Sequence, residues 1–190
     1  MESEIGHCHV TKITPCQFRD AFAKAVEESR EDVKTHWTAA ADYTRLMRGR
    51  ILPQVAKLLG LEAHCDDYYT LDAVFYAEKD TKYFSPFKTY AKYLVVAIEH
   101  ENLAATSSVE MNKLQLINAP LKVLITYAKP GSETDGLLSR YNEIVRSADC
   151  FGDTASLRRQ LVIFGEPDGS SWHFFAYERE GFARLPATSC

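Results

Sequence analysis

Three acidic residues in the middle of the chain have a spacing that suits metal binding. Asp72 lies within one apolar segment, residues 69–76, and Glu99 and Glu101 follow another, residues 93–98. An ionised carboxylate in or at the end of a buried strand is costly unless something pairs with it. Residues two apart on an extended strand point to the same face, so we expect Glu99 and Glu101 to converge. Asp72, on a neighbouring strand, can join them there.

Converging carboxylates repel one another, so such a site needs either a divalent cation or basic partners. Carboxylate and water oxygens suit Mg²⁺ or Mn²⁺ rather than zinc, and we expect Asp72, Glu99 and Glu101 to be the ligands. A bound ion of this kind polarises a phosphate and lowers the pKa of an attacking water. Both effects are useful in phosphodiester hydrolysis.

A lysine completes the candidate site. Lys113 lies near the middle of a helix that we predict over residues 107–118, directly after the acidic pair. If this helix packs back on the sheet, its ammonium can orient or activate the attacking water, or stabilise the developing charge. Glu110 and Gln115 belong to the same helix but to other angular positions, so we rank them below Lys113.

The elements that must position these residues follow from the hydrophobic pattern. We expect a helix from Pro15 with Thr14 as its N-cap, and a second helical region over 37–59 that breaks near Pro53. Residues 79–92 are a polar loop or hairpin. Strands are predicted over 69–76, 93–98, 121–127, 161–164 and 172–177, and further helices over 107–118 and 137–148.

This order of elements predicts an α/β protein with a central mixed sheet flanked by helices and an N-terminal helical region. The strand–helix–strand unit over 93–127 requires at least one parallel, right-handed crossover. A length of 190 residues predicts one domain over 1–190. We divide it into N-terminal helices (1–60), an α/β core (61–180) and a tail (181–190).

The acidic pattern resembles the PD-(D/E)xK nuclease superfamily, which has the restriction-endonuclease-like fold. The similarity lies in an acid on one strand, Asp72, and a second acid at the end of the next strand, Glu99. A helix and another strand follow. The resemblance covers about a third of the chain and a short motif. It implies a metal-dependent nuclease that acts on nucleic acid.

The chain departs from the superfamily pattern at two positions. Leu71 precedes Asp72 where the family often has proline, and Glu101 occupies the usual lysine position. Some members have glutamate there, and in others the lysine lies on the following helix, where Lys113 stands. The resemblance also implies an acid from the first helices, for which the candidates are Asp20, Glu27, Glu28 and Asp42.

The overall charge does not point to nucleic acid. Lys and Arg total 22 and Asp and Glu total 26, so the formal net charge is −4. This argues against a broadly basic surface but permits a local basic patch. Two basic stretches could contact phosphates or could be solvated faces; the candidate contacts are Arg45, Arg48, Arg50, Lys82 and Lys88.

Composition also indicates the compartment. No apolar run is long enough to span a bilayer, and the first residues lack the basic start and apolar core of a signal peptide. We therefore expect a cytoplasmic protein without a membrane partner. The five cysteines form no CxxC pair, which favours reduced thiols.

Two alternatives to a nuclease remain open at this stage. The first is a non-catalytic module on the same fold, which holds nucleic acid or a protein partner, including a second copy in a homodimer. The second is an unrelated α/β fold in which the acids are structural, with Asp72 and Glu99 on opposite faces of the sheet.

Overall fold

The computed structural model describes residues 12–78, 81–83, 89–91, 93–148, 159–166, 169 and 171–186, with backbone only for 81–83, 89 and 90. The helices are α1 (Pro15–Glu28), α2 (Arg30–His36), α3 (Ala40–Leu46), α4 (Leu52–Leu58), α5 (Ser107–Gln115) and α6 (Ser132–Ala148). A π-helical turn, η1 (Met47–Ile51), joins α3 to α4. The strands are β1 (Glu62–His64), β2 (Ala73–Tyr76), β3 (Thr81–Tyr83), β4 (Thr89–Ala91), β5 (Val96–Glu101), β6 (Leu121–Tyr127), β7 (Gln160–Gly165), β8 (Trp172–Glu178) and β9 (Gly181–Arg184).

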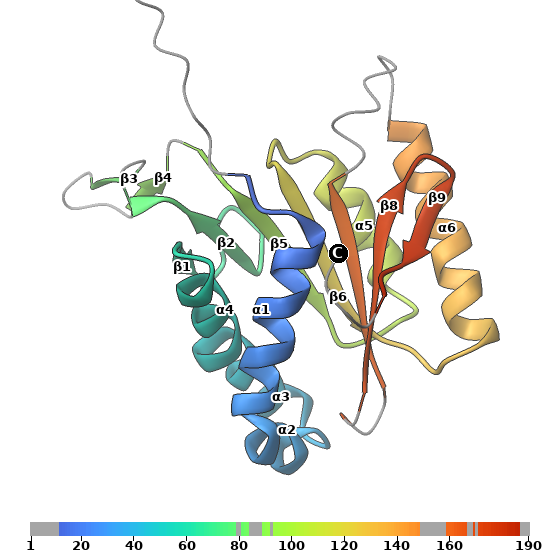
Figure 1. The fold of residues 1–190 in the computed structure, drawn as a ribbon, viewed down its shortest axis with the longest axis horizontal. Coiled ribbons are helices and arrows are strands. Elements are labelled where there is room, and N and C mark those ends of the chain that lie inside the picture. Colours follow the sequence, from blue (N-terminus) through green and yellow to red (C-terminus); the bar gives the residue numbers. More distant parts are fainter. Residues whose placement is uncertain are drawn as a thin grey trace, which may run out of the picture.

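Seven of these strands form one mixed sheet in the order β1-β2-β5-β6-β7-β8-β9. β5, β6 and β7 are parallel, and the other neighbours are antiparallel. β3 and β4 form a separate antiparallel ribbon that projects from the main sheet (Figure 1). The predicted mixed α/β architecture, and the crossover through α5 between parallel β5 and β6, are confirmed.

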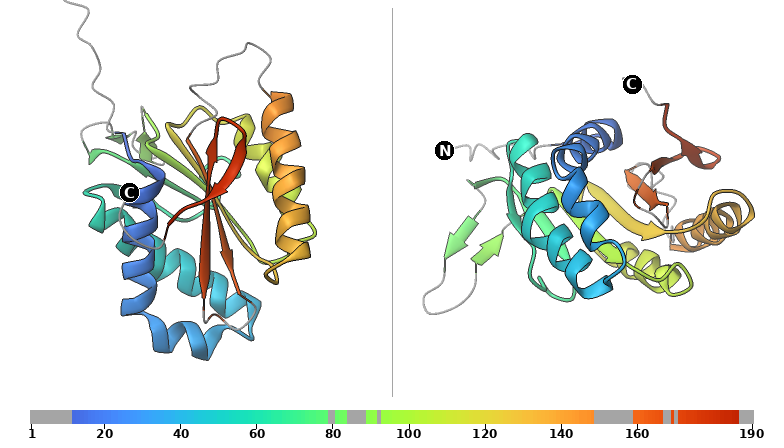
Figure 2. Two further views of the ribbon diagram at one scale, coloured as in Figure 1. Left: turned by 45° about the vertical axis from the view of Figure 1, so that its right-hand side comes forward. Right: turned by 90° about the horizontal axis from the view of Figure 1, so that it is seen from below.

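The helices cover the sheet on both faces. α1 to α4 lie over one face and α5 and α6 over the other (Figures 1 and 2). Each interface holds its own apolar cluster: Phe18, Phe22 and Phe75 belong to the first, and Leu114, Tyr141 and Val162 to the second. The sheet is therefore buried from both sides, which explains the nearly continuous apolar runs of β6 and β7. None of the helices in the described part of the chain combines the length and apolar character that a membrane span needs.

The first helix begins where the sequence predicts, but the second helical region does not break at Pro53: it runs without interruption from Ala40 to Leu58. Thr14 Oγ1 accepts a hydrogen bond from the Gln17 backbone N–H at 3.2 Å, and Gln17 Oε1 accepts one from the Thr14 N–H at 2.9 Å. This reciprocal capping box fixes the start of α1. Pro53 lies in the first turn of α4, where its missing N–H costs little, and η1 precedes it.

The strand predicted over 69–76 forms only from Ala73. Tyr69 and Thr70 have φ angles of 49° and 76°, and a bridge between Tyr68 and Leu71 closes a tight turn there. Asp72 therefore lies immediately before β2, not inside a strand. The β-branched and aromatic composition of residues 69–76 predicted a longer strand. Composition does not indicate a left-handed backbone, which Tyr69 and Thr70 adopt.

Other boundaries differ from the prediction by a few residues. β5 runs over Val96–Glu101, so both glutamates lie within the strand rather than after it. β1 and β9 are too short to show a periodic pattern and were not predicted. Cys16 is disulfide-bonded, which contradicts the expectation of reduced thiols at that residue, whereas Cys65 is a free thiol.

Candidate functional site

Asp72 and Glu99 lie beside each other at the carboxyl end of β5. β2 pairs antiparallel with β5 through Ala73 and Ile98, and continuing this register places Asp72 next to Glu99. Asp72 Oδ2 also accepts a hydrogen bond from the His100 backbone N–H at 2.7 Å. The carboxyl ends of β5, β6 and β7 form the lower edge of the sheet in Figure 1. The two acids are therefore neighbours, and the charge of Asp72 acts on Glu99. Their partners come from different layers, because Arg48 reaches Asp72 from η1 and Lys113 reaches Glu99 from α5.

Each of the two carboxylates has a basic partner. Arg48 reaches from η1 and pairs with Asp72 through NH2 and Oδ1. Lys113 Nζ lies 2.9 Å from Glu99 Oε1 and donates a hydrogen bond to the Thr70 carbonyl at 3.0 Å. Sequence reasoning allowed either a cation or basic side chains to balance these acids, and in the described residues basic side chains do so.

Burial strongly perturbs the titration of this group. Glu99 is only 1% exposed, and burial raises the pKa of its carboxyl to about 9; Asp72 and Glu110 add to the rise, and Lys113 opposes it. Partial burial lowers the pKa of Lys113, but its hydrogen bonds to Glu110 and Glu99 outweigh this and leave that pKa raised. Clusters of ionisable groups with perturbed pKa values are typical of functional sites.

The third predicted ligand, Glu101, has a separate environment. Its Oε1 accepts a hydrogen bond from the Leu103 backbone N–H at 2.9 Å. The charge of Glu101 acts on the Tyr141 hydroxyl, whose pKa is raised mainly by burial. It is not among the charges that shift the pKa of Glu99. Within the described ranges, no group of three or more His, Cys, Asp or Glu side chains is placed to hold a metal ion. Glu101 is thus set apart from Asp72 and Glu99.

Glu110, which we ranked below Lys113, belongs to the site. Its Oε2 lies 2.5 Å from Lys113 Nζ, so the lysine bridges two carboxylates. Our ranking was wrong, and the spacing contained the signal: residues three apart on a helix lie on the same face. Gln115 points elsewhere and exchanges hydrogen bonds with Gln160 on β7.

The acids of the first helices have partners away from the site. Each one forms a local or inter-helix contact: Asp20 with Arg19, Glu27 with Arg30, Glu28 with Gln54, and Asp42 with Arg45. The contribution of η1 and α1–α4 to the site is instead a cation, Arg48. The sequence marked Arg48 as a phosphate contact and gave no sign that it pairs with Asp72.

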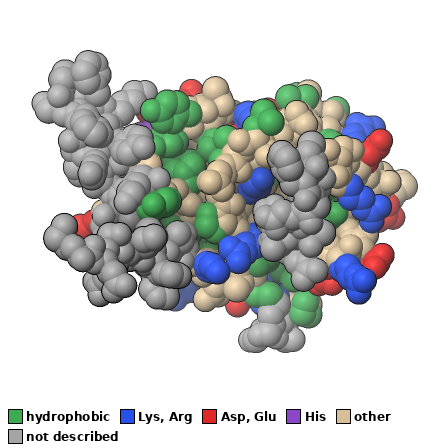
Figure 3. Space-filling view, turned by 90° about the horizontal axis from the view of Figure 1, so that it is seen from above, with side chains coloured by type: hydrophobic (Ala, Val, Ile, Leu, Met, Phe, Trp, Pro, Cys, Tyr) green, Lys and Arg blue, Asp and Glu red, His purple; other side chains and the backbone are tan. Residues whose placement is uncertain are grey.

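The predicted basic stretches have compensated charges where they can be described. Arg45 pairs with Asp42 at 2.8 Å, and Arg50 pairs with Asp32 on α2. The side chains of Lys82 and Lys88 lie outside the described residues. At the opposite end of the sheet, Lys and Arg side chains are scattered among apolar and acidic ones (Figure 3). The roles of Arg45, Arg50, Lys82 and Lys88 in phosphate contact remain predictions.

His100 points to the other face of β5, as its alternation with Glu99 and Glu101 predicts. Its Nε2 lies 2.6 Å from the Tyr127 hydroxyl, and its ring lies 6.0 Å from that of Tyr43. Burial lowers the pKa of His100 to about 4. The residue therefore belongs to an aromatic cluster on the α1–α4 face rather than to the carboxylate site.

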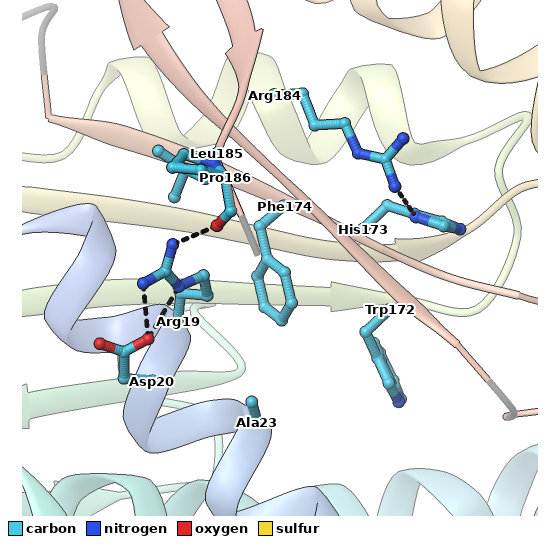
Figure 4. A pocket seen from close by; sticks show the side chains of 9 residues that line it. All are labelled: Arg19, Asp20, Ala23, Trp172, His173, Phe174, Arg184, Leu185 and Pro186. Atoms are coloured by element: carbon cyan, nitrogen blue, oxygen red, sulfur yellow. Dashed lines mark hydrogen bonds and ion pairs between the residues drawn. The ribbon is translucent and has the colours of Figure 1, made fainter. Parts of the chain in front are cut away.

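Besides a cavity of about 400 Å³ between α1 and the end of α4, two cavities among the described residues lie on the α1–α4 side of the sheet. One, of about 490 Å³, lies between α1 and the β8–β9 hairpin (Figure 4). Its charged groups satisfy one another: Arg19 pairs with Asp20, and Arg184 donates to His173, which contacts Glu166. The other, of about 300 Å³, lies at the carboxyl ends of β5 and β6 beside Asn102 and Tyr127. Only the second adjoins the strand end that carries the carboxylates.

Comparison with known proteins does not identify a family for this chain. A scan against protein-family profiles finds no match, and a search of curated proteins returns none that is significant. Function must therefore be argued from the geometry.

Proposed function

We propose that this protein is a nuclease-like enzyme that hydrolyses phosphodiester bonds in nucleic acid with Mg²⁺ or Mn²⁺. The observation that carries the proposal is the buried Glu99 carboxyl beside Asp72, with the Lys113 ammonium 2.9 Å away. The order along the chain supports a restriction-endonuclease-like fold: Asp72 stands before β2, Glu99 on β5, Lys113 on α5, and β6 follows. This is the order that the resemblance to PD-(D/E)xK nucleases implies.

Two carboxylates are a sufficient protein contribution for a magnesium ion. Mg²⁺ keeps several waters and is commonly held by one or two carboxylates together with substrate phosphates. Asp72, immediately before β2, and Glu99, on the neighbouring β5, supply oxygen donors of the right kind. Arg48 and Lys113 balance their charge in the described arrangement, and we expect an ion to take over part of that role. Glu101 is a candidate only for a further ligand or a base.

The bound ion would supply polarisation of the phosphate and a lower pKa for the attacking water. Lys113 is held by Glu99, Glu110 and the Thr70 carbonyl, so its ammonium is oriented before substrate arrives. A fixed cation of this kind stabilises the negative charge that develops on the phosphate oxygens. Because the pKa of Glu99 is about 9, metal binding must also expel a proton near neutral pH.

Cleavage assays with purified protein test this proposal. We expect Mn²⁺- or Mg²⁺-dependent cleavage of at least one substrate among single- and double-stranded DNA and RNA. Asp72→Asn and Glu99→Gln should reduce the rate by at least about 100-fold, the range seen when a group that stabilises the transition state is removed. Asp42→Asn is the matched control, since Asp42 pairs with Arg45 at the surface and should leave the rate unchanged.

Metal binding gives a second measurement that does not depend on finding the substrate. Calorimetric titration with Mn²⁺ should show binding to the wild type that weakens in both site variants and strengthens as the pH rises toward 9. Cleavage that is equal in the wild type and both variants would overturn the proposal.

A non-catalytic module is the second candidate, and one observation favours it. Both site carboxylates already have basic partners, so the site is electrically balanced without an ion. On this alternative, the wild type neither binds Mn²⁺ nor gains thermal stability from it, and nucleic acid or a protein partner binds without being cleaved.

A further inference from the structure

An aromatic pocket opens at the same end of the sheet as the carboxylate site. It has a volume of about 300 Å³ and is lined by Trp37, Thr38, Ala40, Tyr43, Asn102 and Tyr127. These residues come from the end of α2, the link to α3, α3 itself, and the carboxyl ends of β5 and β6. Figure 2 shows, from below, how α2 and α3 lie over this edge of the sheet. The volume is at the lower end of the range for small-molecule pockets, which suits one ring system.

The walls of the pocket are aromatic and rigid. The Trp37 ring packs edge-on against both Tyr43 and Tyr127, each with a centroid separation of 4.9 Å. Tyr127 is held in turn by His100 Nε2 at 2.6 Å. Tyr43 is only 2% exposed, so the accessible ring surface belongs to the half-buried Trp37 and Tyr127. Because these two rings are already held in place, a planar ligand can stack on them at little entropic cost.

Polar groups stand beside the rings. The Asn102 amide nitrogen donates to Thr44 Oγ1 at 2.8 Å, which fixes the side chain and leaves its amide oxygen for a ligand donor. The Tyr43 hydroxyl is buried beside that of Tyr127, which His100 Nε2 also contacts at 2.6 Å. A planar ligand that carries both donors and acceptors on its edge matches this lining.

We propose that this pocket binds a single unstacked nucleobase of the substrate strand. Asn102 is three residues beyond Glu99, so their Cα atoms are at most about 10 Å apart. The two sites lie on opposite faces of β5 at its end, and the Asp72–His100 hydrogen bond joins them across that edge. A nucleic-acid strand can cross this edge of the sheet with one phosphate at Asp72 and Glu99. A base next to that phosphate can then turn into the pocket. The inference rests on the proposed function and adds that the substrate is unpaired at that nucleotide.

Trp37 provides a direct probe of base binding. The chain has two tryptophans, so Trp172→Phe leaves Trp37 as the only indole. We expect a short single-stranded oligonucleotide, added in EDTA so that no cleavage occurs, to quench its fluorescence. An oligonucleotide of equal length and charge that lacks its bases should bind about 5- to 150-fold more weakly, the range expected for loss of one base–aromatic stack.

Variants separate the pocket from general electrostatic binding. Trp37→Ala should weaken binding of the base-containing strand, measured by anisotropy of a labelled oligonucleotide, and leave the abasic strand unaffected. Trp37→Phe and Asn102→Ala test the same pocket if Trp37→Ala does not fold. Leu116→Ala is the matched control, because this 81%-exposed side chain lies at the other end of the sheet, before β6. Leu116→Ala should change neither the affinity for the base-containing strand nor that for the abasic strand.

The outcomes distinguish this inference from the proposed nuclease function. Base-dependent quenching without any metal-dependent cleavage would support the pocket and count against the nuclease. Cleavage together with equal affinity for the two strands would overturn the pocket alone. Quenching by a fully paired duplex as strong as that by a single strand would also overturn it, since a paired base cannot enter.

Discussion

Glu99 and His100 are neighbours in β5, yet they occupy opposite kinds of environment. Glu99 faces α5 among charged groups, and burial raises the pKa of its carboxyl to about 9. His100 faces the aromatic side chains of the other layer, and burial lowers its pKa to about 4. Both side chains are therefore driven toward their neutral forms. Glu99 has the Lys113 ammonium in direct contact, whereas His100 is acted on by the charges of Arg48 and Asp72 without pairing with either. One face of this strand end therefore holds a cation against a carboxyl, and the other packs a neutral imidazole among aromatic rings.

The largest expected effect comes from removing that cation. Lys113→Met should lower the cleavage rate by about 100- to 1,000-fold, because no other ammonium is held at the Glu99 carboxyl in the described residues. Lys113→Arg should retain part of the rate. The measurement is single-turnover cleavage at saturating metal. If Lys113→Met cleaves as fast as the wild type, the lysine only balances charge and the two faces do not differ in chemistry.

The second effect concerns the loss of stability as the pH rises from 4.5 toward 9. The unfolded chain ionises Glu99 near pH 4.5 and the folded chain only near 9, so the folded state binds the extra proton between these values and loses stability as the pH rises. Glu99→Gln removes this loss. As the pH rises from 4.5 to 7, the free energy of unfolding of Glu99→Gln should increase by about 3 kcal/mol relative to that of the wild type, measured by urea denaturation. A constant difference across that range would show that Glu99 stays ionised in the ion pair.

His100 should act in the opposite direction. Its pKa falls from 6.5 to about 4 on folding, so the unfolded state binds the extra proton in that window and stability falls as the pH drops through it. The full loss is up to about 3 kcal/mol. His100→Gln should flatten the pH dependence between 6.5 and 4 and leave that above pH 7 unchanged. Acid unfolding that is identical in the variant would place the titration elsewhere.

Much of this fold could be predicted from the sequence because its core elements have strong periodic signals. β6 and β7 are apolar runs that the sheet buries on both faces, and α1 has a complete capping box. The approach of Asp72 to Glu99 was also expected, from the pairing of two neighbouring strands. In each case the information is local, or needs only the pairing of neighbouring strands.

The features that the sequence did not predict depend on local turns and tertiary contacts. The alternation of side chains along a strand does not indicate these. The turn at Tyr69 and Thr70 shifts Asp72 out of the strand, and nothing in the residue types requires positive φ there. Arg48 on η1 pairs with Asp72, which precedes the start of β2, and this is a tertiary contact between residues 24 apart in the chain. The separation of Glu101 from the carboxylate pair arises because its Oε1 accepts the Leu103 N–H where β5 ends.

The smallest predicted effects come from substitutions of Arg48 and Arg45, two arginines that the sequence analysis named as candidate phosphate contacts. Arg48→Met should cost about 1–3 kcal/mol of stability, since it removes the partner of a carboxylate that is only 15% exposed. Arg45→Met breaks a surface pair with Asp42 and should cost less than about 0.5 kcal/mol. If Asp72 is a metal ligand, Mn²⁺ should raise the melting temperature of Arg48→Met by more than that of the wild type, because the ion then meets a carboxylate without a competing guanidinium. An equal rise in both proteins would mean that Asp72 is a structural acid held by Arg48 and His100, and that the charged face of β5 begins at Glu99.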